Sequence, residues 1–322
     1  VDTHFLVLPF NSVRSFRSAT VAAADFAAGL KAAESGDFAN ALREFKASAE
    51  QGDMKSQYYL AQIFRRGDGV LIDFNKAMRW YQESAGQGYA PANFAIGLMY
   101  SKGIGVKRNL LEAVKKYQIA AEQGHGPAQY NLGVSYDKGR GIAQNYQKAV
   151  FWYNRAAQQG NAKGQYNLGV MHEFGLGVEK SSETAFQWYF KSASQGYAWA
   201  QYNLGVAYLR GRGVSKNYNA AAKWFLLAAE QGDEKAQSNL GVRYQLGQGV
   251  PKNVVIANMW YLLATANGSD IGAKNGRDIE KKIDTDIYTG WILKYKHEKF
   301  KSNIKIYLDS ELTPYLLSIK ER

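Results

Sequence analysis

The sequence predicts an all-α solenoid built from about seven helix–turn–helix repeats. Two glycine landmarks recur at one fixed spacing, which is the signature of repeat architectures. A Gln-Gly pair returns every 36 residues (87 − 51 = 36), and a Gly-x-Gly tripeptide keeps the same register between the pairs. The pairs begin at Gln51, Gln87, Gln123, Gln159, Gln195 and Gln231, with Asn267-Gly268 in the same place; the tripeptides begin at Gly67, Gly103, Gly139, Gly175, Gly211 and Gly247.

These landmarks divide most of the chain into repeats of equal length. Six full repeats occupy residues 53–268 without an insertion. Residues 25–52 are predicted to form a shortened N-terminal repeat, with a first helix over 26–35 and a second over 38–51, because apolar residues recur there at helical spacing.

The two ends of the chain fit the pattern less well. Residues 269–322 are predicted to be a C-terminal helical cap and tail, with a last helical pair over 270–299 that has drifted from the repeat. We assign no structure to 300–322. Residues 1–24 form either a signal peptide or a disordered leader.

Residues 1–24 contain features that favour an export signal and features that argue against one. A short apolar run and Ala22-Ala23-Ala24 favour a cleaved signal peptide, whereas Asp2, Arg14 and Arg17 oppose it. Export predicts a periplasmic or secreted bacterial protein; the alternative is a cytoplasmic one.

The first helix of a typical repeat carries a Leu-Gly pair with a Tyr three residues after the glycine, a position that holds His172 in one repeat. Leu132 and Tyr136 are four residues apart and therefore share one helix face. Gly133 lies beside them, although glycine in a helix interior costs about 1 kcal/mol relative to alanine. Its recurrence as Gly169 and Gly205 predicts that a neighbouring helix approaches closely at this point.

The second helix carries one broad apolar stripe. Ala149, Trp152, Tyr153, Ala156 and Ala157 recur in the next two repeats, with Ser at one alanine position and Phe at one tyrosine position, and their spacing matches one helix face. We expect the helix to begin at residues whose side chains accept hydrogen bonds from first-turn N–H groups. These N-cap residues are Asp73, Asn109, Asn145, Ser181, Asn217 and Asn253. Glycines of both landmarks are expected to end helices, where a left-handed backbone is needed.

Composition excludes several kinds of chemistry. The 322 residues include no Cys, which removes disulfides, thiolate nucleophiles and Cys-based zinc sites. The four His lie at different repeat positions, so we expect no metal site, and no cofactor motif is present. A nucleophile elbow and a phosphate-binding loop are also missing from the sequence, which favours a protein that is not an enzyme.

The charge favours anionic partners without specifying one. The formal net charge is +12 and the pI is about 9.5. The basic residues are scattered, however, and are equally typical of a soluble surface with a positive bias. No run of 18 apolar residues exists, so no membrane-spanning helix is expected. We expect a monomer or weak self-association.

The repeat resembles the Sel-1-like repeats of the tetratricopeptide superfamily. The resemblance rests on Ala-Gln-Tyr-Asn-Leu-Gly-Val at 128–134, followed by Tyr136, Gly139, Gly141, Asn145, Ala149, Trp152, Tyr153 and Ala156, and it covers roughly 25–283. It implies a right-handed α–α superhelix whose first helices line a concave groove, and a role as an adaptor that binds other proteins. Some cysteine-rich relatives were described as β-lactamases, but a chain without Cys gives no ground to carry that activity over.

The resemblance also implies a groove site. In tetratricopeptide grooves an Asn before the Leu-Gly pair often bonds the backbone of a bound peptide. The matching residues are Asn131, Asn167, Asn203 and Asn239; Tyr130, Tyr166 and Tyr202 precede the first three of them, and Arg66, Lys102, Lys138 and Arg210 follow one or two turns later in their repeats. These residues would suit an extended or acidic protein segment. Alternatively, Asn and Tyr only brace adjacent repeats.

Two other functional classes remain open. Exposed Tyr and Trp faces would also suit an envelope carbohydrate or peptidoglycan, and binding that survives high salt would distinguish it from an acidic protein partner. Helical repeats can bind RNA, but no repeat position shows a base-reading pattern, so no nucleic-acid partner is expected.

Overall fold

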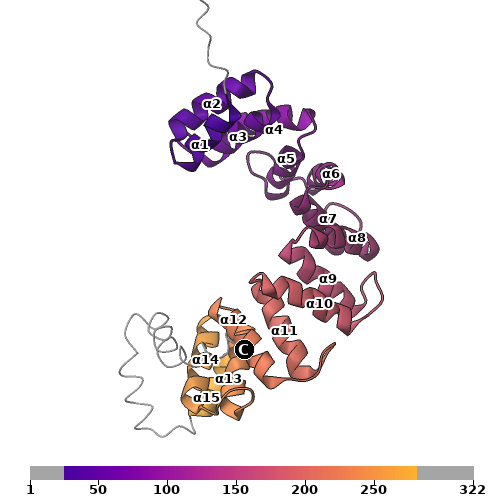
Figure 1. Cartoon of the computed structure of the whole chain (residues 1–322), viewed down its shortest axis with the longest axis vertical. Coiled ribbons are helices and arrows are strands. Elements are labelled where there is room, and N and C mark those ends of the chain that lie inside the picture. The colour runs from indigo at the N-terminus through magenta and orange to yellow at the C-terminus, as the bar shows by residue number, and fades with distance from the viewer. Residues whose placement is uncertain (1–24, 281–322) are drawn as a thin grey trace, which may run out of the picture. The chain divides into compact units, whose positions relative to one another are not determined.

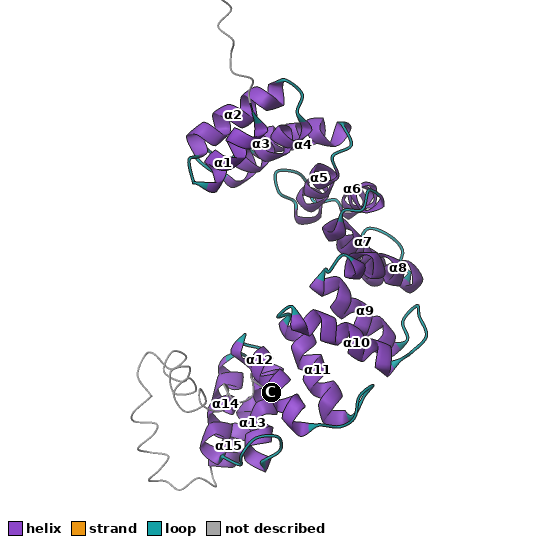
Figure 2. Cartoon of the chain, in the orientation of Figure 1, coloured by secondary structure: helices purple, strands orange, loops and turns teal. Residues whose placement is uncertain are grey.

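The computed structural model describes residues 25–280 of the chain. Within that range it contains fifteen helices and no strand, which confirms the predicted all-α class (Figures 1 and 2). The helices are α1 Phe26–Glu34, α2 Phe38–Glu50, α3 Met54–Arg66, α4 Phe74–Gly86, α5 Ala90–Lys102, α6 Leu110–Glu122, α7 Gly126–Lys138, α8 Tyr146–Gln158, α9 Ala162–Phe174, α10 Ser182–Ser194, α11 Ala198–Arg210, α12 Tyr218–Glu230, α13 Glu234–Leu246, α14 Val254–Ala266 and α15 Asp270–Glu280.

The chain divides into two compact units, residues 1–108 and 109–322. The described part of the N-terminal unit holds α1–α5, and that of the C-terminal unit holds α6–α15. Within each unit every helix packs against the next one along the chain, and α1 and α13 also contact α3 and α15, respectively, as in a solenoid whose repeats contact their neighbours. The leader at 1–24, the second helix expected within 270–299 and the tail at 300–322 lie outside the described residues.

The predicted N-caps of the second helices are confirmed. Asn145 Oδ1 accepts a hydrogen bond from the Lys148 backbone N–H at 2.9 Å, and Ser181 Oγ accepts one from Thr184 at 3.1 Å. The first helices add caps of their own, including Asp53, Asn161 and Asp233. These helices therefore start where a side chain satisfies a backbone N–H that has no partner inside the helix, whereas α5 and α11 begin after Tyr89 and Tyr197 without a side-chain cap.

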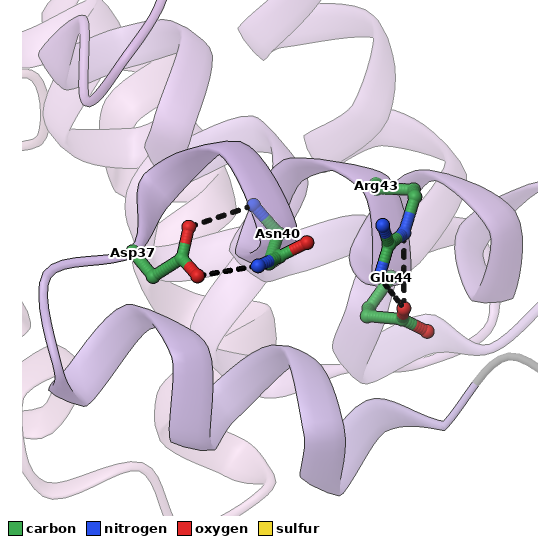
Figure 3. A network of polar contacts seen from close by, with 4 residues as sticks. All are labelled: Asp37, Asn40, Arg43 and Glu44. Carbon is green, nitrogen blue, oxygen red and sulfur yellow. Dashed lines mark hydrogen bonds and ion pairs between the residues drawn. The ribbon is translucent and has the colours of Figure 1, made fainter.

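The shortened repeat uses the same device at α2. Asp37 accepts hydrogen bonds from both the side chain and the backbone N–H of Asn40, and these bonds, the side-chain bond first, hold the pKa of Asp37 below its usual value (Figure 3). One turn later Arg43 pairs with Glu44 at 2.9 Å on the solvent side.

Glycine is required at both positions of the Gly-x-Gly landmark. Gly175 ends α9 with φ of 69°, and its N–H donates to the Met171 carbonyl oxygen. Gly177 also has a positive φ, and a Cβ there would overlap the Tyr146 backbone of the preceding repeat. The first glycine thus supplies a left-handed helix end, and the second allows the loop to lie directly on its neighbour.

Aromatic rings explain the glycine of the Leu-Gly pair. A Cβ on Gly169 would lie 2.7 Å from Cε1 of Tyr189, which belongs to the second helix of the same repeat. Tyr189 itself is only 3% exposed. The close approach predicted from the sequence is therefore confirmed: the nearest atoms belong to the Tyr189 ring, and the Ala185 carbonyl oxygen of the same second helix follows at 3.3 Å. The same pairing joins Gly133 to Tyr153, Gly205 to Phe225 and Gly241 to Tyr261.

At Gln87, Gln159 and Gln231 the Gln of the Gln-Gly pair donates a hydrogen bond to a carbonyl oxygen of the preceding repeat. Gln159 Nε2 donates to the Gly124 carbonyl oxygen at 3.0 Å and to Gln129 Oε1 at 2.9 Å. Gln129 Nε2 in turn donates to the Ala121 carbonyl oxygen at the end of α6. Gln231 and Gln201 repeat this arrangement further along the C-terminal unit. The Gln-Gly landmark is consequently both a turn and an inter-repeat junction.

We expect Gly169→Ala to lower the melting temperature, because its new methyl group would overlap the Tyr189 ring. Overpacking of this kind costs about 1–3 kcal/mol. Gly86→Ala is the matched control: no atom lies within 4 Å of the added Cβ at the end of α4, so stability should be unchanged or higher. Thermal unfolding followed by circular dichroism measures both, and equal melting temperatures for the two variants would contradict the ring-on-glycine packing.

A second prediction concerns pH and the cap of α7. His125 Nδ1 accepts a hydrogen bond from the Ala128 N–H at 3.3 Å, which requires an unprotonated nitrogen, and burial lowers the pKa of His125 below 6.5. The unfolded chain then binds the proton more readily, so this contribution to stability is complete above about pH 6.5 and is lost as the pH falls through the folded-state pKa.

The measurement is thermal unfolding between pH 8 and pH 5 for the wild type and for His125→Asn. Asparagine caps a helix without titrating, so the variant should lose less stability on acidification, by an amount within the roughly 1 kcal/mol that a cap contributes. Parallel curves for the wild type and His125→Asn would be the contrary result.

Candidate functional site

The first helices of the C-terminal unit share an exposed stripe with one regular layout. Four residues spaced at i, i+4, i+7 and i+11 lie on one face of each helix. The outer two are exposed and the inner two are half-buried in every case. This first-helix stripe consists of Pro127, Asn131, Val134 and Lys138 on α7; Lys163, Asn167, Val170 and Phe174 on α9; Trp199, Asn203, Val206 and Arg210 on α11; and Lys235, Asn239, Val242 and Leu246 on α13.

The predicted Asn row lies in the middle of the stripe and contacts tyrosines of the preceding repeat. Burial raises the pKa of Tyr130, and a hydrogen bond with the Asn167 side chain acts in the opposite direction. Tyr166 is affected in the same way by burial and by Asn203. Asn239 additionally donates to the Lys235 carbonyl oxygen at 2.9 Å. The Asn side chains therefore link adjacent repeats, as the bracing alternative expects.

The predicted Tyr row lies beside the stripe and is half-buried. The Tyr130 ring is 6.1 Å from that of Tyr153, and the Tyr166 ring is 5.9 Å from that of Tyr189. Tyr202 packs against Phe225 at the same 5.9 Å separation. These rings extend the aromatic packing within each repeat and offer one partly exposed side each.

The predicted cations are divided between the two units. Arg66 and Lys102 are exposed last residues of α3 and α5 in the N-terminal unit. In the C-terminal unit Lys138 pairs with Asp137 at 3.1 Å. Arg210 is exposed and forms no ion pair within residues 25–280. The equivalent positions on α9 and α13 hold the exposed apolar residues Phe174 and Leu246, which were not predicted as site residues.

An aromatic cluster on the stripe was also not anticipated. Trp199 is 59% exposed, and its ring lies 5.8 Å from that of Tyr197 and 6.0 Å from that of Tyr166. Tyr166 and Tyr197 are 5.4 Å apart, and burial raises the pKa of Tyr197 to about 12, which keeps its hydroxyl neutral. We refer to these three residues as the Trp199 cluster.

A comparison of the residues at equivalent positions of the repeats would have revealed this cluster. The other first helices place Lys55, Pro91, Pro127, Lys163 and Lys235 at the position of Trp199. An exposed Trp in a column of lysines and prolines is not required by the repeat, and so marks a feature of this surface rather than of the fold.

Buried carboxylates next to the stripe are already occupied. Tyr189 donates from its hydroxyl to Glu173 Oε2 at 2.6 Å, and Glu173 Oε1 pairs with Arg212 at 3.2 Å. Burial and the neighbouring Glu173 both raise the pKa of Tyr189. Tyr153 donates in the same way to Asp137 at 3.2 Å. Among residues 25–280 there is no group of three His, Asp or Glu side chains placed to hold a metal ion, and no helix long and apolar enough to cross a bilayer.

Tandem 36-residue helix–turn–helix units of this kind define a tetratricopeptide-like helical-repeat protein. The Sel1 repeat model matches six consecutive segments of the chain, residues 55–89, 90–125, 126–161, 162–197, 200–233 and 234–269. The chain therefore belongs to the Sel1 repeat family, whose members are generally protein-interaction scaffolds.

Two solved structures are similar to the chain. One is c5321, a protective antigen present in uropathogenic Escherichia coli strains that has the same repeat fold. The two are 35% identical with a TM-score of 0.69, and the match covers 72% of this chain and 50% of that protein, so the chain spans about half its length. The other is a Sel1 repeat protein from Oxalobacter formigenes: 32% identity, TM-score 0.67, covering 73% of this chain and 94% of that one. No curated protein sequence matches the chain.

Proposed function

We propose that the chain is a non-enzymatic scaffold that binds an extended, acidic segment of another protein along the first-helix stripe of its C-terminal unit. The exposed Trp199 cluster is the observation that carries this proposal. Tryptophan is the residue type most often found at the energetic centre of protein interfaces. The exposed part of its indole gains little from folding, so a Trp at this position favours a role in contact with a partner.

The charge of the stripe favours an acidic partner. Lys163 and Lys235 occupy the positions equivalent to Trp199 in the two neighbouring repeats, and Arg210 lies at the other end of α11. The stripe itself contains no Asp or Glu. A segment carrying carboxylates beside an apolar residue would meet cations on either side of the indole, which supports both attraction and orientation.

The Val and Asn residues suit the backbone of such a segment. Val134, Val170, Val206 and Val242 form a half-buried apolar row between the exposed ends of the stripe. An Asn side chain has two donor hydrogens and an acceptor oxygen. Contact with a tyrosine of the preceding repeat therefore leaves each Asn with capacity for a peptide group of the partner, so bracing and binding are compatible.

The test is selection from a displayed library of random twelve-residue peptides on the immobilised full chain. Wild type should enrich Asp and Glu, and the affinity of the selected peptides should fall with added salt. Trp199→Ala should weaken them by about 30-fold, corresponding to about 2 kcal/mol at an interface centre. Lys163→Glu combined with Arg210→Glu should abolish the acidic preference. The matched control is Phe190→Ala, which removes a 45% exposed ring from second helix α10 and should change nothing.

Failure to enrich acidic peptides, or equal binding by Trp199→Ala, would contradict the proposal. Binding of isolated peptidoglycan glycan strands that survives 1 M salt would instead favour the carbohydrate alternative.

The Asn row is tested separately. Asn167→Ala with Asn203→Ala should weaken peptide capture and also lower the melting temperature, since both contacts are lost, at about 1 kcal/mol for each hydrogen bond. A lower melting temperature with unchanged capture would limit these residues to bracing.

A further inference from the structure

A small pocket opens beside the first-helix stripe between α9, α10 and α11. Its free space is about 30 Å³. One buried water molecule needs about 10–15 Å³ of such space, so the pocket has room for roughly two water-sized groups. Two residues of the stripe, Asn203 and Val206, line it together with Ala207, which is 6% exposed.

The pocket is lined by Ala207, which is smaller than the equivalent residue in either adjoining repeat. The equivalent residue on α9 is Met171, which is 1% exposed, and on α13 it is Arg243, which is 7% exposed. The Arg243 guanidinium lies 5.8 Å from the ring of Tyr218, and that ring stands where the pocket has Ser182 (218 − 36 = 182). Large side chains thus occupy this place in both neighbouring repeats, and alanine leaves it open.

The lining of the pocket favours an uncharged and mainly apolar occupant. Ala185, Phe186 and Val206 supply apolar walls. The charged residues of the lining compensate each other, because Glu173 pairs with Arg212 at 3.2 Å and also accepts the Tyr189 hydroxyl. A further charged group would lose its hydration without gaining an unpaired partner. A short β-branched side chain, with two heavy atoms on Cβ, matches both the size and the polarity.

We propose that the pocket at Ala207 is a specificity subsite that takes a valine or threonine side chain of the acidic segment bound on the stripe. This inference rests on the proposed function. Trp199 and Ala207 are eight residues apart on α11, which corresponds to about 12 Å along the helix. The part of the segment between Trp199 and the pocket would run along α11. An extended chain rises about 3.3 Å per residue, so the side chain in the pocket is separated by about four residues from the one on Trp199.

The natural repeats provide the variants for the test. Ala207→Met fills the pocket with the residue that α9 carries at the same place, so the chain should fold with an unchanged or higher melting temperature. Ala207→Ser introduces the residue found at this position on α7, Ser135, and should keep the pocket. Ala207→Leu is a second filling variant for use if methionine lowers the melting temperature.

The full chain and the Ala207 variants are compared by the same selection of displayed twelve-residue peptides. Wild type and Ala207→Ser should enrich acidic peptides with valine or threonine about four positions from an apolar or aromatic residue. Ala207→Met should keep the acidic preference but bind the wild-type peptides about tenfold more weakly, as expected when a pocket loses one or two buried methyl contacts.

The outcomes separate this inference from the proposed function. Acidic peptides without a β-branched residue at a fixed position, or equal affinity for wild type and Ala207→Met, would overturn the subsite alone. No acidic enrichment on any variant would overturn the binding proposal and the subsite together. Loss of the β-branched preference only on the filled variants is the result that supports the subsite.

Discussion

Each complete repeat of the C-terminal unit depends on an aromatic ring that lies against a glycine. The ring comes from the second helix and the glycine from the first, as with Tyr189 and Gly169. Removing the Cβ lets the two helices approach closely enough for the ring to be almost fully buried, and the apolar area hidden in this way outweighs the cost of glycine in a helix. The rest of the repeat is arranged around that contact: the caps fix where the helices begin, and the loop glycines let the next repeat lie against them.

Periodic features could be predicted from the sequence because each repeat reports the same physical requirement. The Asn caps, the left-handed glycine at Gly175 and the close approach at Gly169 could each be predicted by comparing the residues at one equivalent position of successive repeats. The site was less predictable. The contacts of the Asn row with Tyr130 and Tyr166 depend on the offset between adjacent repeats, which spacing along one helix does not specify.

The features with most bearing on binding are departures from the repeat. Trp199 stands in a column of lysines and prolines, and Ala207 stands between Met171 and Arg243. A comparison of repeats that looks for shared residues does not detect such departures. In a solenoid the common residues maintain the framework, and the surface residues that differ between repeats are free to define a partner. Both departures lie on α11, which makes that helix the centre of the proposed site.

The glutamine junctions have a consequence for how such chains change in length. Gln159 donates to the Gly124 carbonyl oxygen in the turn that precedes its own repeat and to Gln129 within that repeat, and Gln231 makes the equivalent bonds two repeats later. A duplicated or excised block of 36 residues would present the same donors and acceptors at its new boundary. Gain or loss of whole repeats would therefore leave no Gln side chain without a hydrogen-bond partner at the new boundary. The length of the solenoid could then change without new contacts between its repeats.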